Sequence, residues 1–307
     1  MGTVRRETRF AGFTLQSRTI ASAVRKSRRI EPDELTPDKL KLIFEIESDA
    51  MCLLAVQYRL VPESPILVAA NREEYFDRPS LTPSIQSGKP RVLCGIDQKA
   101  GGTWLGVNQT GLFVGVTNRI TSNPLFGQRS RGLLALDLLR CTSSEKALEK
   151  AQAEFANTRY EGCNIIIADA AGGYAIHADE RQEVVELRDG LNIIGAHNLN
   201  DPDDGRVQMA RRLLTLQTLD SPVKFLAVAS RVFARAPVGP GRPSMVVRKP
   251  DYGTVSSSLI ALGVKPRDAI YQFSNGAPDQ SKYEDYSPML RDILSRGLRE
   301  ARTKAKA

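Results

Sequence analysis

The apolar run from Cys52 to Tyr58, Cys-Leu-Leu-Ala-Val-Gln-Tyr, constrains the fold of this chain more than any other segment. A short, nearly continuous run of this kind predicts a buried strand. Almost every segment with a chemical signature lies after it. We therefore expect one folded domain over residues 51–307, with Met51 directly before its opening strand.

The fifty residues before this strand differ in character. Between Met1 and Ile30 there are eight basic residues and one acid, Glu7. Three explanations are open: an upstream start that leaves Met51 as the true initiator, a cleaved mitochondrial targeting segment, or a disordered extension. We favour the first and expect residues 1–50 to lie outside the domain.

Charge is spread along the chain. The net charge is +8, and because residues 1–50 hold ten basic and eight acidic residues, it is +6 for residues 51–307. A nucleic-acid partner is not expected, since no basic stripe with interleaved aromatic residues is visible. Nor does any apolar run approach the roughly 18–20 residues that a transmembrane segment needs.

Four cysteines and two histidines limit the metal and redox chemistry. The cysteines lie far apart without a C-x-x-C pair, and with only His177 and His197 available a structural zinc site is not expected. The pattern is not that of a disulfide-stapled secreted domain, so we expect the reducing cytoplasm. If residues 1–50 are a transit peptide, the expected location is mitochondrial. The residues imply no cofactor.

Turn signals and apolar spacing predict strands in hairpins, with helices between and after them. The predicted strands are Cys52–Tyr58, Ile66–Ala70, Trp104–Asn108, Leu112–Thr117, Cys163–Ala168, Gly173–Ala178, Glu183–Leu187, Leu191–Ala196, Ser256–Leu262 and Ala269–Phe273. The predicted helices are Gly132–Arg140, Lys146–Asn157, Val207–Leu219, Val223–Ala234 and Met289–Ala301. Two antiparallel sheet groups separated by helices are typical of a layered α+β domain.

An amino-terminal cysteine would supply chemistry that the usual motifs do not, because no G-x-S-x-G, Walker loop or H-E-x-x-H is present. If Cys52 is the first residue, its α-amino group, with a reference pKa of about 7.7–8.0, can take the proton of its own thiol. A guanidinium stabilises a thiolate, and Asn side chains donate to an oxyanion. Residues of these types follow predicted strands: Asn71 and Arg72, Asn118, and Asn198.

Five short motifs, taken together, resemble one known family. They are Met51-Cys-Leu-Leu54, Ala70-Asn-Arg-Glu-Glu-Tyr-Phe-Asp-Arg-Pro79, Gly101-Gly-Thr-Trp-Leu-Gly106, Gly115-Val-Thr-Asn-Arg119 and Tyr283-Glu-Asp-Tyr286. In this order they are similar to the NRDE family, which includes the transport and Golgi organisation protein 2 group, and the resemblance runs across residues 51–307. The eponymous Asn-Arg-Asp-Glu reads Asn-Arg-Glu-Glu here, so Glu73 extends its carboxylate by one methylene.

This resemblance implies a fold and a set of site residues. NRDE proteins are in turn similar to N-terminal-nucleophile hydrolases, which fold as a four-layer αββα sandwich of two antiparallel sheets and cleave non-peptide amides. The implied roles are Cys52 as nucleophile, Arg72 as thiolate partner, Glu73 or Glu74 as the group that orients the amino group, and Asn118 and Asn198 as oxyanion donors.

Two functions are open at this point. The first is hydrolysis of a C–N or acyl bond in a small-molecule amide or acyl substrate by Cys52. The second is non-catalytic binding of a hydrophobic ligand, since the resemblance also implies haem or lipid handling, with Golgi organisation and secretion in eukaryotic relatives. The first hypothesis requires a free amino group on Cys52, and it fails if residues 1–50 stay attached.

Overall fold

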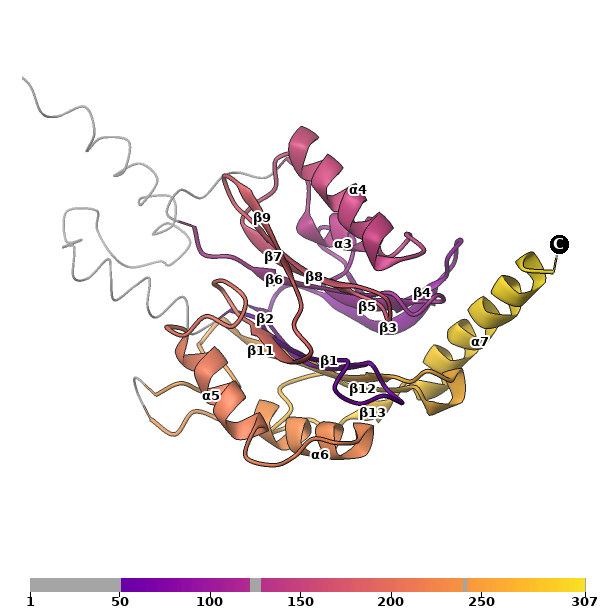
Figure 1. Ribbon diagram of the computed structural model, residues 1–307. Coiled ribbons are helices and arrows are strands. Elements are labelled where there is room, and N and C mark those ends of the chain that lie inside the picture. Colours follow the sequence, from indigo (N-terminus) through magenta and orange to yellow (C-terminus); the bar gives the residue numbers. More distant parts are fainter. Residues whose placement is uncertain (1–50, 122–127, 240–241, 307) are drawn as a thin grey trace, which may run out of the picture.

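A computed structural model of the chain describes residues 51–121, 128–239 and 242–306. Two antiparallel sheets lie face to face, and helices cover the outer face of each sheet (Figure 1). The layers therefore run helix, sheet, sheet, helix, which confirms the predicted αββα sandwich. The prediction that residues 1–50 form an extension lies outside the described residues.

The first sheet has six strands in the order β10, β1, β2, β11, β12, β13. Their bounds are β10 (Gly190–Ile194), β1 (Leu53–Tyr58), β2 (Ile66–Tyr75), β11 (Tyr252–Leu262), β12 (Ile270–Ser274) and β13 (Glu284–Asp285). Leu54 pairs with Ile194 on one side and with Ala70 on the other. Because β1 is held from both sides, the residue before it, Cys52, has a defined place at the end of an inner strand.

The second sheet is a seven-stranded meander in which every strand neighbours the next one in the chain. Its strands are β3 (Ser80–Gln86), β4 (Val92–Asp97), β5 (Leu105–Asn108), β6 (Phe113–Asn118), β7 (Cys163–Ala168), β8 (Gly173–Ala178) and β9 (Gln182–Glu186). Strands β7 and β8 have the predicted bounds, whereas β3 and β4 were not predicted.

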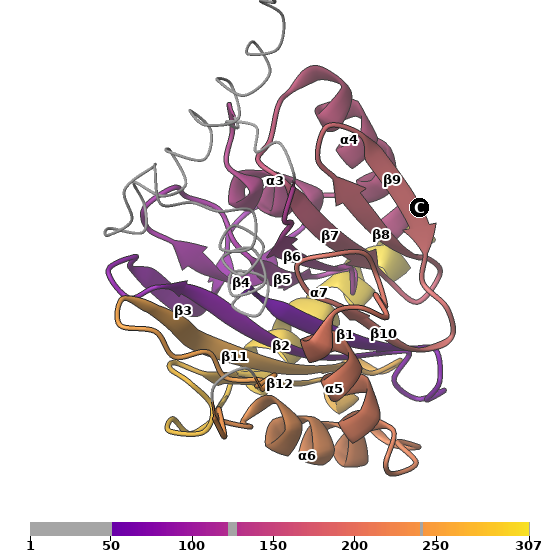
Figure 2. The same ribbon diagram turned by 90° about the vertical axis from the view of Figure 1, so that its left-hand side faces the viewer.

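Two pairs of helices cover the sheets, and a last helix closes one edge (Figure 2). They are α3 (Arg131–Leu138) and α4 (Ser144–Asn157) on the second sheet, α5 (Gly205–Leu214) and α6 (Pro222–Phe233) on the first, and α7 (Ser287–Lys304), with a short 3₁₀ turn η2 (Pro266–Asp268). Helix α7 packs against β12 of the first sheet and β4 of the second. The five predicted helices are thus confirmed, with ends displaced by a few residues.

Strand β1 is buried along its whole length because both of its faces are covered. Leu53 and Ala55 point toward α5 and α6 and join the cluster of Val207. Leu54 and Val56 point the other way, into the core between the sheets. The alternation of side chains along a strand therefore explains why this run contains almost no polar residue.

Strand β2 is longer than predicted. The sequence indicated a strand over Ile66–Ala70, with Asn71 and Arg72 after it, but the strand continues to Tyr75 and pairs with β11 throughout. The prediction of its end was wrong because Asn71 to Glu74 are polar, and local polarity suggests a loop. The buried side chains of Asn71 and Glu73 are accommodated in the sheet because groups from distant segments form hydrogen bonds with them.

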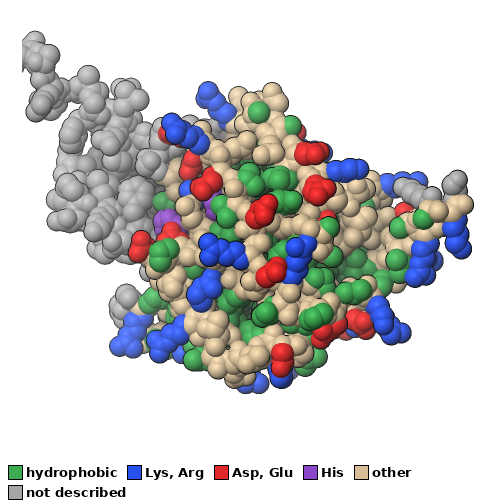
Figure 3. All heavy atoms as spheres, in the orientation of Figure 1, with side chains coloured by type: hydrophobic (Ala, Val, Ile, Leu, Met, Phe, Trp, Pro, Cys, Tyr) green, Lys and Arg blue, Asp and Glu red, His purple; other side chains and the backbone are tan. Residues whose placement is uncertain are grey.

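The surface agrees with the even spread of charge. On the face drawn in Figure 3, basic and acidic side chains are interspersed rather than gathered by sign. Within the described ranges, no helix combines the length and apolar character needed to cross a bilayer.

Candidate functional site

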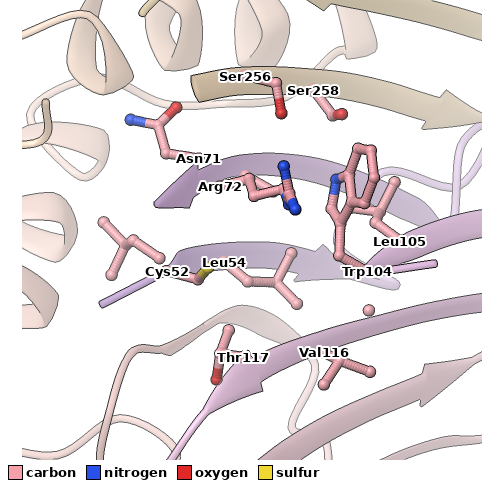
Figure 4. A pocket seen from close by; sticks show the side chains of 13 residues that line it. Cys52, Leu54, Asn71, Arg72, Trp104, Leu105, Val116, Thr117, Ser256 and Ser258 are labelled. Atoms are coloured by element: carbon pink, nitrogen blue, oxygen red, sulfur yellow. The ribbon is translucent and has the colours of Figure 1, made fainter. Parts of the chain in front are cut away.

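Cys52 lies where two cavities meet, between the sheets at the start of β1. An outer cleft has a volume of about 290 Å³ and an inner cavity about 10 Å³, and Cys52, Arg72, Trp104 and Val116 line both. Figure 4 shows the inner cavity, with the Cys52 side chain on one side and Arg72 and Trp104 on another. The residue as a whole is partly exposed, and it lines both cavities.

The Cys52 thiol is neutral in the chain as it stands. The backbone N–H of Glu73 donates to Sγ at 3.4 Å, and Sγ in turn lies 3.7 Å from the carbonyl oxygen of Glu73. Burial raises the thiol pKa to about 12, the Glu73 carboxylate adds to the rise, and the Glu73 N–H and Arg72 oppose it. With Met51 attached, the thiol therefore needs a further base or cation to ionise at neutral pH.

Arg72 carries a buried charge with loose polar contacts. Its guanidinium carbon lies 4.4 Å from the centre of the Trp104 ring. Its nearest described polar partners are Glu74 Oε2 at 3.7 Å and Ser80 Oγ at 3.4 Å, and only 6% of the residue is exposed. Such contacts leave N–H donors able to bind an anion that forms in the cleft.

Glu73 and Glu74 lie on opposite faces of β2, because successive side chains of a strand alternate. Glu74 faces the outer cleft and lies 3.4 Å from Arg78. Glu73 is buried with its Oε1 bound by Arg206 at 3.1 Å and by the hydroxyl of Thr254 at 3.0 Å. The two carboxylates that the sequence left as alternatives are therefore in different environments.

The second oxygen of Glu73, Oε2, is buried and has no hydrogen-bond partner among the described residues. Burial raises the pKa of Glu73, while Arg206 and Thr254 oppose the shift. A buried carboxylate oxygen without a donor is costly. It is also an acceptor available to a cationic group placed beside it.

Arg206 is the site residue that the sequence did not reveal. It lies in the first turn of α5, is 2% exposed, and donates to the carbonyl oxygens of Ser244 and Met245 at 2.9 Å each. It also donates to the carbonyl oxygen of Met51. The same guanidinium thus holds Glu73 and the backbone immediately before Cys52. Asp204 is recognisable as the helix cap, but nothing local distinguishes Arg206 from the other arginines of α5.

The two predicted oxyanion donors have different positions. Asn118, the last residue of β6, lines the outer cleft together with Cys52. Asn198 is exposed in a turn after β10, and it is not among the residues that line either cavity. The structure therefore brings Cys52, Arg72, Glu74 and Asn118 together around the cleft, with Glu73 behind them, and leaves Asn198 outside.

A buried polar network holds the segment that contains Asn198. Asn164 donates to the carbonyl oxygens of Gly195 and His197, at 3.1 and 2.9 Å. His177 contacts Asn164 Oδ1 through Nδ1 at 2.8 Å and accepts from the Leu199 N–H through Nε2 at 3.2 Å. These contacts require a neutral ring, and burial lowers the pKa of His177 to about 4. His177 thus helps to hold this segment in place, and it lines neither cavity.

Charged side chains of both signs line the outer cleft. They are Arg72, Arg78, Arg129, Arg131, Glu74, Asp97 and Glu161. Asp97 is bound by Arg78 at 2.6 Å, and Arg131 lies 3.2 Å from Glu161. Across the described ranges, no three His, Cys, Asp or Glu side chains are grouped so as to hold a metal ion.

The Gly101–Gly102 turn connects two residues that line this cleft, Ala100 and Thr103. Both glycines have positive φ, and a Cβ on Gly102 would lie 2.1 Å from the backbone of Gly132 at the start of α3. Glycine is required at this close approach. The turn delivers Trp104, which lines both cavities beneath Arg72.

Comparison with known proteins gives a family match over most of the domain. A family model described as Transport and Golgi organisation 2 matches residues 51–267. The Transport and Golgi organization protein 2 homolog of Bos taurus is 25% identical over 269 residues, which cover 76% of this chain and 96% of that protein. The Homo sapiens homolog is 32% identical over 127 residues, covering 39% of this chain and 45% of its own length.

Two solved structures have a similar arrangement of elements. A mutant of the conjugated bile acid hydrolase from Clostridium perfringens is 12% identical with a TM-score of 0.44, covering 78% of this chain and 93% of that one. A Caenorhabditis elegans ortholog of N-acylethanolamine-hydrolyzing acid amidase is 13% identical with a TM-score of 0.45, covering 68% and 92%. At these scores the likeness says nothing about activity.

Proposed function

The chain belongs to the Transport and Golgi organisation 2 family, and we propose that it is an amidohydrolase whose nucleophile is Cys52 bearing a free α-amino group. The observation that carries the proposal is the position of Cys52 Sγ at the junction of the two cavities, with Arg72 and Asn118 lining the same cleft. The substrate is a small-molecule amide or a comparable acyl compound.

Acylation begins with proton transfer from the Cys52 thiol to its own α-amino group. The thiolate attacks the carbonyl carbon of the amide, and the Asn118 side-chain amide donates to the oxygen that becomes negative. The resulting α-ammonium gives its proton to the leaving nitrogen, the C–N bond breaks, and the amine departs. A thioester remains on Cys52.

Deacylation uses the same groups. Water attacks the thioester carbonyl and passes a proton to the α-amino group, the C–S bond breaks, and the carboxylic acid leaves. Arg72 stabilises the thiolate in both halves of the reaction. Glu73 accepts a hydrogen bond from the α-ammonium through Oε2, and Arg206 loses its Met51 contact when that residue is removed.

Two observations support this role for the amino group. Burial raises the pKa of the Cys52 thiol to about 12 with Met51 attached, so a base beside the sulfur is needed to ionise it near neutral pH. The guanidinium of Arg206 binds both the Met51 carbonyl and Glu73, so the backbone before Cys52 lies next to a carboxylate with an unused acceptor.

The test uses protein expressed from its native start. We expect intact mass and amino-terminal sequencing to find a chain that begins at Cys52, and an activated acyl ester to add one acyl group to it. Cys52→Ala should abolish the labelling, whereas Cys141→Ala, at the other partly exposed cysteine, should not. Equal labelling of Cys52→Ala, or an active preparation in which Met51 is retained, contradicts the proposal.

If residues before Cys52 stay attached, the raised pKa of the Cys52 thiol favours a second function, the binding of a ligand without catalysis. A neutral thiol is not a nucleophile, and the cleft would then bind a ligand without turnover. Haem or an acyl lipid fits less well than a polar ligand, because seven charged side chains line the outer cleft. Titration of the purified full chain with haem and with fatty acids, followed by Trp104 fluorescence, tests this function.

We also propose a cytoplasmic location, since a nucleophilic Cys52 has to remain reduced. Imaging of the chain with a carboxyl-terminal tag tests it. A mitochondrial signal that is lost on deletion of residues 1–50 would favour the transit-peptide alternative instead.

A further inference from the structure

The inner cavity behind Cys52 is small and has buried walls. Its volume of about 10 Å³ is close to the minimum that admits one water molecule. Leu54 and Leu105 line it from β1 and β5, and both belong to the core between the sheets. The inner cavity therefore has room for only one or two heavy atoms beyond the Cys52 sulfur.

Strand β6 provides a further wall through Gly115, Val116 and Thr117, and at Gly115 this wall has no side chain. Gly115 and Leu54 both line the cavity and lie against each other, since a Cβ at Gly115 would lie 2.9 Å from Leu54 Cδ2. The Leu54 side chain thus already occupies the room that a longer group would need. Leu54 of the first sheet and Gly115 of the second thus close the cavity where they meet.

The order of product release assigns the acyl group to this inner cavity. In the proposed reaction the amine leaves first, while the acyl group stays bonded to Cys52. The inner cavity, at about 10 Å³, has no room for a departing amine beside the thioester. The amine must therefore lie in the outer cleft, and the acyl group points inward.

The outer cleft selects the amine portion by polarity. Its volume of about 290 Å³ lies at the lower end for ligand sites. A long apolar group in it would remove water from charged side chains of both signs without replacing their hydrogen bonds, which is unfavourable. A polar amine of about amino-acid size can contact these groups instead.

We propose that the substrates are amides of short acyl groups, near acetyl in size, with a polar, amino-acid-sized amine portion. This assignment rests on the amidohydrolase function proposed above. It names a class opposite in character to long-chain acyl amides, and it follows from the two cavity sizes and their linings.

Acyl-chain selectivity of Cys52 labelling tests the inference on the full chain. Acetyl, butanoyl and octanoyl 4-nitrophenyl esters are compared by the rate of Cys52 acylation, with Cys52→Ala as the background. We expect acetyl to react at least about tenfold faster than octanoyl, since each surplus methylene in a filled apolar pocket costs about tenfold or more. Octanoyl reacting as fast overturns the inference and leaves the nucleophile intact. Labelling by none of the three esters overturns the proposed function itself.

Variants of buried leucines test whether the cavity wall, and not the core in general, sets the acyl-chain selectivity. Leu54→Ala should raise the octanoyl-to-acetyl ratio at least about tenfold. Leu67→Ala is the matched control, because Leu67 is an equally buried leucine that packs toward α5 and α6, and it should leave the ratio unchanged. If Leu54→Ala does not fold by circular dichroism, Leu105→Ala opens the cavity from the other sheet. An unchanged ratio in a folded opening variant overturns the inference.

Competition tests the amine portion. N-acetylglycine should slow acylation by the acetyl ester at lower concentration than N-octylacetamide does. The reverse order would overturn the polar-amine part of the assignment.

Discussion

Replacement of Arg206 by methionine is the sharpest test of how the site is built. Arg206→Met keeps most of the side-chain volume and removes the charge and the donors. Glu73 then loses its ion pair at 3.1 Å, in a position where its side chain is fully buried. The carbonyl oxygens of Ser244 and Met51 lose a donor as well.

The expected cost follows from what is left unpaired. Removal of one partner from a buried ion pair destabilises a protein by about 3–5 kcal/mol, because the other charge stays buried. Total stabilities are of the order of 5–15 kcal/mol. We therefore expect Arg206→Met to consume a large part of the free energy of unfolding of this domain.

A double-mutant cycle isolates the pair. Arg206→Met leaves the Glu73 charge buried without its partner, and Glu73→Gln removes that charge. The double variant should therefore lose about 1–3 kcal/mol less stability than the two single variants lose together. Urea unfolding followed by the fluorescence of Trp104, the only tryptophan in the chain, measures each free energy. Arg212→Met, at an exposed position of α5, is the control and should change stability by less than about 0.5 kcal/mol.

Additive losses of stability in the double variant would contradict an ion pair between Arg206 and Glu73. If the double variant loses the sum of the single losses within about 0.5 kcal/mol, Arg206 and Glu73 do not interact in the folded protein. A loss below about 1 kcal/mol for Arg206→Met would likewise show that Glu73 is not buried as a charge.

Three further predictions concern other parts of the domain. The pKa of His177 is about 4 in the folded chain and 6.5 in the unfolded chain, so the neutral ring stabilises the fold above pH 6.5 and this stabilisation is lost as the pH falls toward 4. Urea unfolding at pH 6.5 and at pH 4 should therefore show that His177→Gln loses about 2–3 kcal/mol less stability on acidification than the unmodified chain does. Gly102→Ala should cost more than about 3 kcal/mol, through its positive φ and the clash with α3, measured as a fall in melting temperature. Arg72→Met should change the Trp104 emission and cost about 0.5–2 kcal/mol, because the cation over the ring is removed.

Control variants show which results would contradict these three predictions. Gly111 also has a positive φ but no atom near its missing Cβ, so Gly111→Ala should cost only about 1 kcal/mol; equal losses at Gly102 and Gly111 would remove the steric explanation. Arg78→Met should leave the Trp104 emission unchanged. An unaltered acid dependence in His177→Gln would show that other groups cause the loss.

The strands of the sandwich were largely predictable because their pattern is local. Strands β7 and β8 match their predicted bounds, and β1 differs by one residue. Strand β3 was missed because it is an edge strand with polar and exposed positions, and its burial pattern shows little alternation. The continuation of β2 was missed since buried Asn71 and Glu73 look like loop residues until their partners are known.

By itself, the sequence determined the layered α+β fold and the small set of residues from which a site could be assembled, because apolar periodicity and turn signals depend on neighbours in the chain. It also marked Cys52, Arg72 and Asn118, which the structure brings to one cleft. Only the tertiary structure showed that Glu74 faces the cleft while Glu73 is buried against Arg206. It also showed that Asn198 lies outside the cleft. The depth of the cavity behind Cys52 was decided in the same way. The contact of Glu73 with Arg206 and the approach of Leu54 to Gly115 each join groups more than fifty residues apart in sequence, and packing between sheets and helices, not local pattern, brings such groups together.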